Sequence, residues 1–250
     1  MIQKHGRIPP AVLFCPIQGL TNRLYRIIIH NAVMKQRYEW RRNMAKQIEG
    51  VSERILECAK AEFLDKGYTD ASLRVIAAAA ETSTNSIYVR FQDKEGLFSA
   101  IVEPVLSVMV ERFLKIQEEF HHMDRAAQAA HMAEYADGGT AELVDYMYDH
   151  LDEFRLLLDA SYGTRFHNFV DELVRIEVEY TYKYMETIGY PTRLGDALTE
   201  KLLHIVTTSR FESIFEVIRH GMSREEAAKY IELLSRYHRT GFFAIFGPET

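Results

Sequence analysis

The side chains best suited to recognise another molecule are concentrated in and beside residues 72–91. The candidates are Ser72, Arg74, Ser83, Thr84, Asn85, Ser86, Tyr88, Arg90 and Lys94. Hydroxyl, amide, phenol and guanidinium groups are short or planar hydrogen-bonding groups, which suits them to base edges and phosphates in a DNA major groove. We expect Thr84, Asn85 and Ser86 to face base edges. Tyr88 and Lys94 are expected at phosphates, and the remaining residues support these contacts.

Two short helices separated by a tight polar break are needed to present these side chains. The first is expected to begin at Ser72, whose hydroxyl can accept a backbone N–H, and to offer a small face at residues 78–80 for close approach of another helix. Ser83 can cap the second helix. In that helix, Ile87 and Phe91 are four residues apart and so face inward. This layout is a helix-turn-helix.

Residues at a characteristic spacing lie in and beside the helix-turn-helix. They are Ala59, Phe63, Gly67 and Tyr68 before it, Ile87, Tyr88 and Phe91 in its second helix, and Lys94, Glu95, Leu97 and Phe98 after it. With these residues the chain resembles the TetR family of bacterial transcriptional regulators, most closely over residues 49–109. The family marks its N-terminal three-helix module with AxxxFxxxGY, a helix-turn-helix that closes on LYxxF, and KExLF.

Two positions depart from the family pattern. Glu81 occupies the turn, where the family usually has Gly and where φ tends to be positive, so we expect a modest backbone cost and a negative charge near the DNA-facing helix. Ala71 stands where the family usually has a capping Thr, and Ser72 can replace it. Affinity for DNA, rather than the fold, is affected by these departures.

The resemblance implies an all-α protein with a DNA-binding module and a helical body. Residues 1–48 are then a basic N-terminal extension, residues 49–109 the DNA-binding domain with its helix-turn-helix at 72–91, and residues 110–248 the effector-binding and dimerisation domain. The implied function is a ligand-responsive repressor that binds a pseudo-palindromic operator as a homodimer in the cytoplasm. No cofactor is implied.

Composition agrees with a globular helical chain. The 250 residues are 47% hydrophobic, with only six prolines and two cysteines, so no disulfide framework is expected. No Gly-rich phosphate loop, GxSxG, HExxH or paired-cysteine metal site is present, which argues against an enzyme. Adjacent histidines at 121 and 122 would point about 100° apart on a helix and could not easily share a metal ion.

Charge is distributed unevenly along the chain. The net charge is −6, yet residues 1–46 hold nine Lys or Arg against one acidic residue. Residues 1–43 are interpreted as a start codon placed too early, a basic arm that reaches the minor groove, or an added helix. The uncharged stretch from Ile8 to Asn22 is too short and too rich in proline to span a membrane, and no secretory cleavage site follows it.

Five apolar segments that indicate helices follow the helix-turn-helix, with Pro104 expected to kink the first. Concentrated Tyr, Phe and Met side chains favour a mostly apolar ligand cavity. We expect its lining among Met109, Phe113, Met147, His150, Phe154, Phe169 and Tyr184. Residues 143–158 are interpreted as one helical segment. Two helices, 196–220 and 223–246, are expected to pair with their copies in a homodimer, and the second should open with a capping box at residues 223–226.

A different reading remains open at this stage. The module at residues 47–99 is itself slightly acidic, and Glu81 adds a negative charge close to the recognition helix. The chain could therefore be a helical interaction protein of the same fold that has weak DNA binding or none. Binding to the DNA upstream of its own gene separates the two hypotheses.

Overall fold

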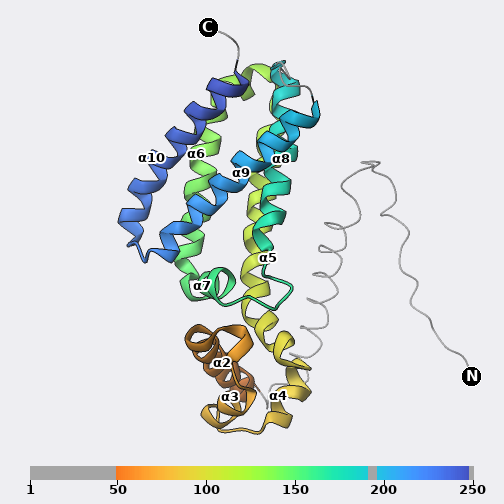
Figure 1. The fold of residues 1–250 in the computed structure, drawn as a ribbon, viewed down its shortest axis with the longest axis vertical. Coiled ribbons are helices and arrows are strands. Elements are labelled where there is room, and N and C mark those ends of the chain that lie inside the picture. Colours follow the sequence, from red (N-terminus) through yellow and green to blue (C-terminus); the bar gives the residue numbers. More distant parts are fainter. Residues whose placement is uncertain (1–48, 191–195, 248–250) are drawn as a thin grey trace, which may run out of the picture. The chain divides into compact units, whose positions relative to one another are not determined.

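The computed structural model describes residues 49–190 and 196–247, and within these ranges it contains helices and no strands (Figure 1). Three helices form the N-terminal module: α2 (Glu49–Asp70), α3 (Leu73–Ala79) and α4 (Thr84–Phe91). The body consists of α5 (Lys94–His121), α6 (Arg125–Asp149), α7 (Leu151–Asp159), α8 (Phe169–Ile188), α9 (Asp196–Arg219) and α10 (Arg224–Phe246). The all-α prediction is confirmed.

The core of the N-terminal module comes from apolar residues that each helix contributes at helical spacing. Its fully buried side chains are Ile55, Ala59, Phe63, Ile76, Ala80, Ile87, Leu97 and Phe98. Phe63 and Phe98 meet edge to face with ring centroids 5.2 Å apart, so α5 is part of this core. Burying a side chain of this size contributes roughly 1.5–3 kcal/mol. The start of α5 is thereby fastened to the helix-turn-helix.

The N-terminus of α4 is capped as the sequence predicts, whereas that of α3 is not. Ser83 caps α4 as predicted, since its Oγ accepts the Ser86 N–H at 3.2 Å. Ser72 occupies the N-cap of α3, but its hydroxyl makes no capping bond; the Glu62 carboxylate instead accepts the Ser72 N–H at 3.0 Å. The predicted hydroxyl cap was therefore wrong, because a carboxylate from α2 stabilises that part of the helix end.

The small face of α3 also differs from the one predicted. Ala78 and Ala79 are exposed, whereas Ala77 and Ala80 are buried. Residues three apart lie on the same side of a helix, whereas consecutive residues do not. Close packing therefore uses the first and last alanines of the run, which are three residues apart.

A close backbone contact links the end of α4 to the start of α5. Asp93 caps α5 by accepting the Gly96 N–H at 2.7 Å. A Cβ atom at Gly96 would lie 1.9 Å from the carbonyl oxygen of Phe91. Only glycine fits at this position without a shift of the backbone.

In the body, α5 packs against α6 and α8, α8 against α9, and α10 against α6. Pro104 lies within α5, which is assigned as one helix of 28 residues; the predicted kink stays a prediction. Residues 143–158 do not form one helix as expected, because the chain changes direction at His150 between α6 and α7. The alanine-rich stretch before residue 141 forms most of α6.

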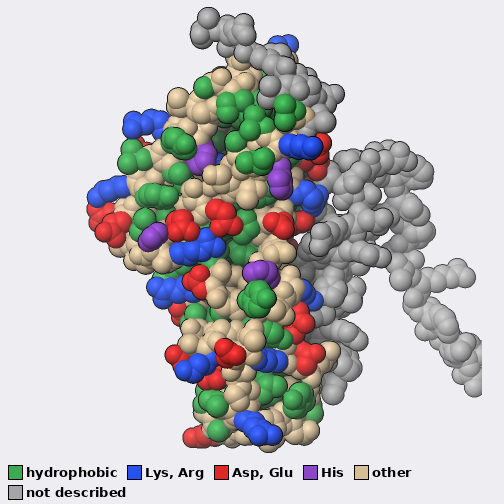
Figure 2. All heavy atoms as spheres, in the orientation of Figure 1, with side chains coloured by type: hydrophobic (Ala, Val, Ile, Leu, Met, Phe, Trp, Pro, Cys, Tyr) green, Lys and Arg blue, Asp and Glu red, His purple; other side chains and the backbone are tan. Residues whose placement is uncertain are grey.

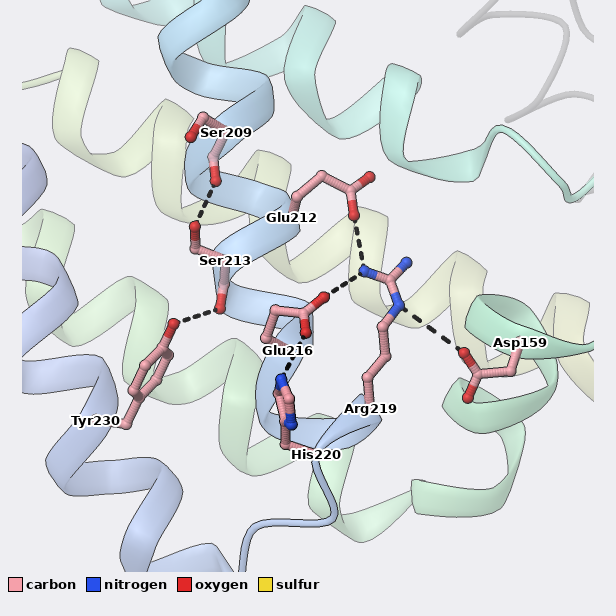
Figure 3. A network of polar contacts seen from close by, with 8 residues as sticks. All are labelled: Asp159, Ser209, Glu212, Ser213, Glu216, Arg219, His220 and Tyr230. Carbon is pink, nitrogen blue, oxygen red and sulfur yellow. Dashed lines mark hydrogen bonds and ion pairs between the residues drawn. The ribbon is translucent and has the colours of Figure 1, made fainter.

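Polar contacts line the C-terminal half of α9, and one of them joins it to α10 (Figure 3). Arg219, in the last turn of α9, donates to Glu212 at 2.8 Å and to Glu216 at 2.9 Å. Its positive charge also offsets the negative end of the helix dipole. The Tyr230 hydroxyl of α10 donates to the Ser213 carbonyl of α9 at 3.2 Å.

Helix α10 opens with the predicted capping box. The Ser223 hydroxyl accepts the Glu226 N–H, and the Glu226 carboxylate accepts the Ser223 N–H at 2.8 Å. None of the helices in the described ranges is long and apolar enough to cross a membrane.

Candidate nucleic-acid interface and effector cavity

Helix α4 presents a mixed polar and apolar face on the outside of the module. Asn85 is exposed, Thr84 and Ser86 are half-buried, and Tyr88 keeps 51% of its surface exposed. Ile87 is fully buried and faces the core. Because Ile87 packs into the core, the orientation of α4 is fixed, and so are the positions of its exposed side chains.

Arg90 braces this helix from within the module. Its Nη1 donates to the Ser86 hydroxyl at 2.6 Å and to the Ser86 carbonyl at 3.1 Å, and its Nε donates to the Ser52 hydroxyl on α2 at 3.2 Å. Ser86 and Arg90, both predicted at the DNA surface, thus contact each other. The guanidinium joins α4 to α2.

Lys94 lies beside the module at the start of α5. Its ammonium donates to the Thr69 carbonyl at 2.9 Å and lies 4.9 Å from the centre of the Tyr68 ring. Burial lowers the pKa of Lys94, while the nearby carboxylates of Asp70 and Glu62 oppose the shift. An ammonium group has three donors, so others remain available beside the bond to Thr69. Arg74 is exposed and Ser72 is half-buried.

Two exposed valines on this surface were not among the predicted site residues. Val75 on α3 is 51% exposed and Val89 on α4 is 69% exposed. Val89 follows Asn85 by one helical turn and so extends the same face. Branched apolar side chains suit contact with thymine methyl groups. The spacing from Asn85 was the signal that could have identified Val89.

The body contains a cavity of 960 Å³ whose walls come from α5, α6, α8, α9 and α10. This volume lies at the upper end of the range for small-molecule sites. Four of the predicted ligand residues line it: Met109, Phe113, Met147 and Tyr184. Burial raises the pKa of Tyr184, so its phenol is neutral in the physiological range.

The other three predicted ligand residues are not among the cavity-lining residues. His150 lies at the α6–α7 junction, with its ring 4.6 Å from that of Tyr146. Phe154 is fully buried in α7. Phe169 packs against Phe215, with ring centroids 5.4 Å apart. The turn at His150 starts α7 and so separates Phe154 from the cavity-lining part of α6. Phe169 lies at the start of α8, whose lining residues are all further along the helix.

Polar residues also line the cavity, and none of those described next was among the predicted ligand residues. Arg210 on α9 donates to Glu177 on α8 at 3.0 Å and to the Thr140 hydroxyl on α6 at 2.7 Å. Gln117 on α5 donates to the other oxygen of Glu177 at 2.6 Å. His238 on α10 also lines the cavity. These side chains are far apart in sequence, and no local spacing indicates that they meet.

Comparison with known proteins bears on both sites. Residues 55–101, which include the whole helix-turn-helix, match the family model described as bacterial regulatory proteins, tetR family. Over these residues the chain matches the TetR family. Regulators of this family are transcription factors rather than enzymes.

Solved structures extend the likeness over the body of the chain. SmeT, the repressor of the Stenotrophomonas maltophilia multidrug efflux pump SmeDEF, aligns with a TM-score of 0.54 and 15% identity, covering 79% of this chain and 96% of its own. A TetR-like transcriptional regulator from Rhodococcus sp. RHA1 gives 0.53 and 17%, covering 76% and 96%. At such identities the likeness shows the fold. A search of curated proteins gave no match.

The described residues contain no cluster of three or more His, Cys, Asp or Glu that could hold a metal ion. His121, one of the two adjacent histidines, has both ring nitrogens on backbone carbonyls, those of Gln117 at 2.8 Å and Tyr180 at 2.9 Å. Its ring therefore joins α5 to α8.

Proposed function

We propose that this protein is a homodimeric transcriptional repressor that binds a pseudo-palindromic operator and is released by a small molecule. The observation that carries the proposal is the exposed face of α4 on a module whose core also holds the start of α5. Thr84, Asn85 and Ser86 read base edges, and Arg90 supports them by fixing α4 against α2.

Contacts with the DNA backbone position the module. Tyr88 and Lys94 contact phosphates in this proposal, with Ser72 and Arg74 as flanking contacts. The Ser83 N-cap leaves its hydroxyl at the N-terminal end of α4, where the helix dipole also favours a phosphate. Because the chain is acidic overall, few of its contacts are cationic, and binding should depend only weakly on salt.

Dimerisation through α9 and α10 supplies the second copy of α4. Several large apolar side chains on these two helices are exposed: Leu198, Ile205, Leu233, Tyr237, Phe243 and Ile245. In Figure 2, hydrophobic side chains gather on the face over α9 and α10. A hairpin with such a face can pair with its own copy in a four-helix bundle. A cytoplasmic location belongs to the same proposal.

The cavity is the proposed effector site, and α5 connects it to the DNA-reading module. Leu97 and Phe98 of α5 are buried in the module core, and Met109 and Phe113 of the same helix line the cavity. A further link is the Tyr68 N–H, which donates to the Ala160 carbonyl after α7 at 2.9 Å. A ligand that favours the DNA-incompetent dimer about a hundredfold supplies roughly 2.7 kcal/mol of coupling.

The test is binding of the purified protein to the DNA upstream of its own gene. Asn85→Ala should lose roughly 1–3 kcal/mol on the specific site, mostly at one base pair, because it removes a base-edge contact. Lys94→Ala is the matched control, since loss of a phosphate contact should weaken specific and random DNA alike. Equal losses on both DNAs for Asn85→Ala would contradict the assignment, and no binding at all would favour an interaction protein.

A further inference from the structure

The cavity of the body has a buried interior and an exposed rim, and the rim lies on one side. Met109, Phe113 and Met147 line the interior and are almost inaccessible to solvent. Among the described residues that line the cavity, every exposed one lies on α9 or α10, apart from Ala136 on α6. The cavity is therefore open to solvent on the side that α9 and α10 form.

This open side coincides with the exposed apolar face of α9 and α10. Four apolar side chains belong both to that face and to the cavity lining: Ile205, Leu233, Tyr237 and Ile245. Ile205 is 62% exposed and Tyr237 is 73% exposed, so each keeps most of its surface in water while it borders the cavity. Leu198 lies two helical turns before Ile205 on the same side of α9 and continues the face beyond the cavity. The cavity rim and the apolar face are thus one continuous surface.

The size and shape of this face suit a second copy of the chain. Helix α9 has 24 residues and is about 36 Å long, so a face two helices wide covers about 700 Å², close to the roughly 800 Å² that each partner contributes to a standard interface. Thr240, Gly241 and Ala244 are exposed on α10, and their small side chains allow another helix to approach closely. Arg236 adds a charge to the exposed lining, and its guanidinium can stay solvated at the polar edge of an apolar interface.

We propose that the second copy of the chain completes the effector site: its α9–α10 face covers the open side of the cavity and forms part of the surface that the ligand contacts. The inference rests on the proposed dimer and on the proposed role of the cavity. In a two-fold dimer the same patch is used on both copies, so each copy closes the cavity of the other. A bound ligand then contacts both chains, and it strengthens dimerisation by the same factor by which dimerisation strengthens its binding.

Leu198→Asp tests the proposal on the full-length protein, because this side chain lies on the apolar face but outside the cavity lining. An aspartate there opposes pairing, and in the first turn of α9 it also suits the helix dipole, which favours folding of the variant. The probe is N-phenyl-1-naphthylamine, an uncharged apolar dye whose fluorescence rises when it leaves water. Sedimentation velocity gives the oligomeric state, and fluorescence titration gives the affinity for the dye.

We expect a wild-type dimer and a monomeric variant that binds the dye about tenfold more weakly, the factor that about 60 Å² of uncovered apolar surface supplies. Leu64→Asp is the matched control, since it places the same charge at an exposed leucine of α2, and it should dimerise and bind the dye as the wild type does. Phe243→Asp is a second variant of the apolar face outside the cavity lining, for use if Leu198→Asp stays dimeric or does not fold.

Acrylamide quenching of the bound dye is a second measurement, and it needs no monomer. The partner copy shields the dye in the wild-type dimer, so quenching should be much weaker than for the free dye. Equal quenching of the bound and the free dye would overturn the inference. If neither variant of the apolar face gives a folded monomer, this comparison decides.

Met147→Trp separates the inference from the cavity assignment, because the larger side chain fills the buried part of the site. If Met147→Trp loses the dye but the monomer and the dimer bind it equally, the inference fails and the effector site stands. Unchanged binding in Met147→Trp, or no binding to the wild type, would refute the effector site as well. A wild type that is monomeric and binds the dye would refute the inference together with the proposed dimer.

Discussion

Replacing Glu81 should separate backbone strain from charge at the helix-turn-helix. Glu81 has a φ of 52°, and it follows the C-cap of α3. Its N–H donates to the Ala78 carbonyl at 3.1 Å, while the Thr82 N–H donates to the Ala77 carbonyl at 2.9 Å. These two bonds define a Schellman motif, which places the residue after the C-cap in a left-handed conformation.

At the ends of two helices of the body, glycine serves this purpose. Helix α8 ends with Gly189 at a φ of 79°, and α9 ends with Gly221 at a φ of 60°. A residue with a Cβ atom costs roughly 1–2 kcal/mol in this region. Glycine avoids that cost but loses roughly 0.5–1 kcal/mol more conformational entropy on folding. Glu81→Gly should therefore stabilise the protein by about 0.5–1 kcal/mol, whereas Glu81→Ala should change its stability little.

Both replacements remove the same exposed negative charge. A unit charge about 8 Å from a phosphate contributes roughly 0.5 kcal/mol in water before screening by salt. DNA affinity should therefore rise about twofold in both variants, with no difference between them. Only the effect on stability should distinguish Gly from Ala.

The stability of the three proteins can be measured by urea unfolding, followed by far-ultraviolet circular dichroism at one fixed protein concentration because a dimer's stability depends on it. Fluorescence anisotropy with labelled operator DNA gives the affinities. If Glu81→Ala gains as much stability as Glu81→Gly, the charge rather than the backbone is responsible, and the reasoning from φ is refuted.

Three further predictions concern the glycine contacts and the polar wall of the cavity. Gly96→Ala should destabilise the protein by more than about 2 kcal/mol in urea unfolding, because the added Cβ would lie 1.9 Å from a backbone oxygen. Gly138→Ala is the control: a Cβ there would have nothing within 4 Å, so this change should stabilise α6 by up to roughly 1 kcal/mol, and equal effects of the two changes would contradict the close contact. The pKa of His238 is lowered from 6.5 by burial, so its contribution to stability should be complete above pH 6.5 and decline as the pH falls through the lower folded pKa. Below pH 6.5 the unfolding free energy of His238→Gln should therefore fall less steeply with falling pH than that of the wild type. Equal slopes for the two proteins would count against a buried neutral ring. Arg210→Met should cost roughly 1–3 kcal/mol because Glu177 loses its cation, and adding Glu177→Gln should restore part of that loss in a double-mutant cycle; simple additivity would show that the pair is not coupled.

The sequence alone determined the elements whose signals are local. The cap at Ser83, the capping box at Ser223 and the left-handed end at Gly189 each depend on residues within a few positions of one another, so their types suffice to predict the helix boundaries. The positive φ of Glu81 was predicted for the same reason. Periodicity also identified Ile87 as an inward position of α4, because a helix of 3.6 residues per turn repeats its inner face.

Tertiary structure decided where contacts between distant segments form. Glu62 replaces the predicted hydroxyl cap of Ser72 because α2 passes beside the start of α3, and no spacing within α3 reports that neighbour. Similarly, the apolar stripes of α5, α6 and α8 predicted a cavity, but the turn at His150 moves Phe154 away from it. The polar wall joins residues from five helices, and the unpartnered nitrogen of His238 exists only because these helices exclude water from it. Helical periodicity specifies which side of a helix is buried, whereas the partner of that side depends on how the helices pack together.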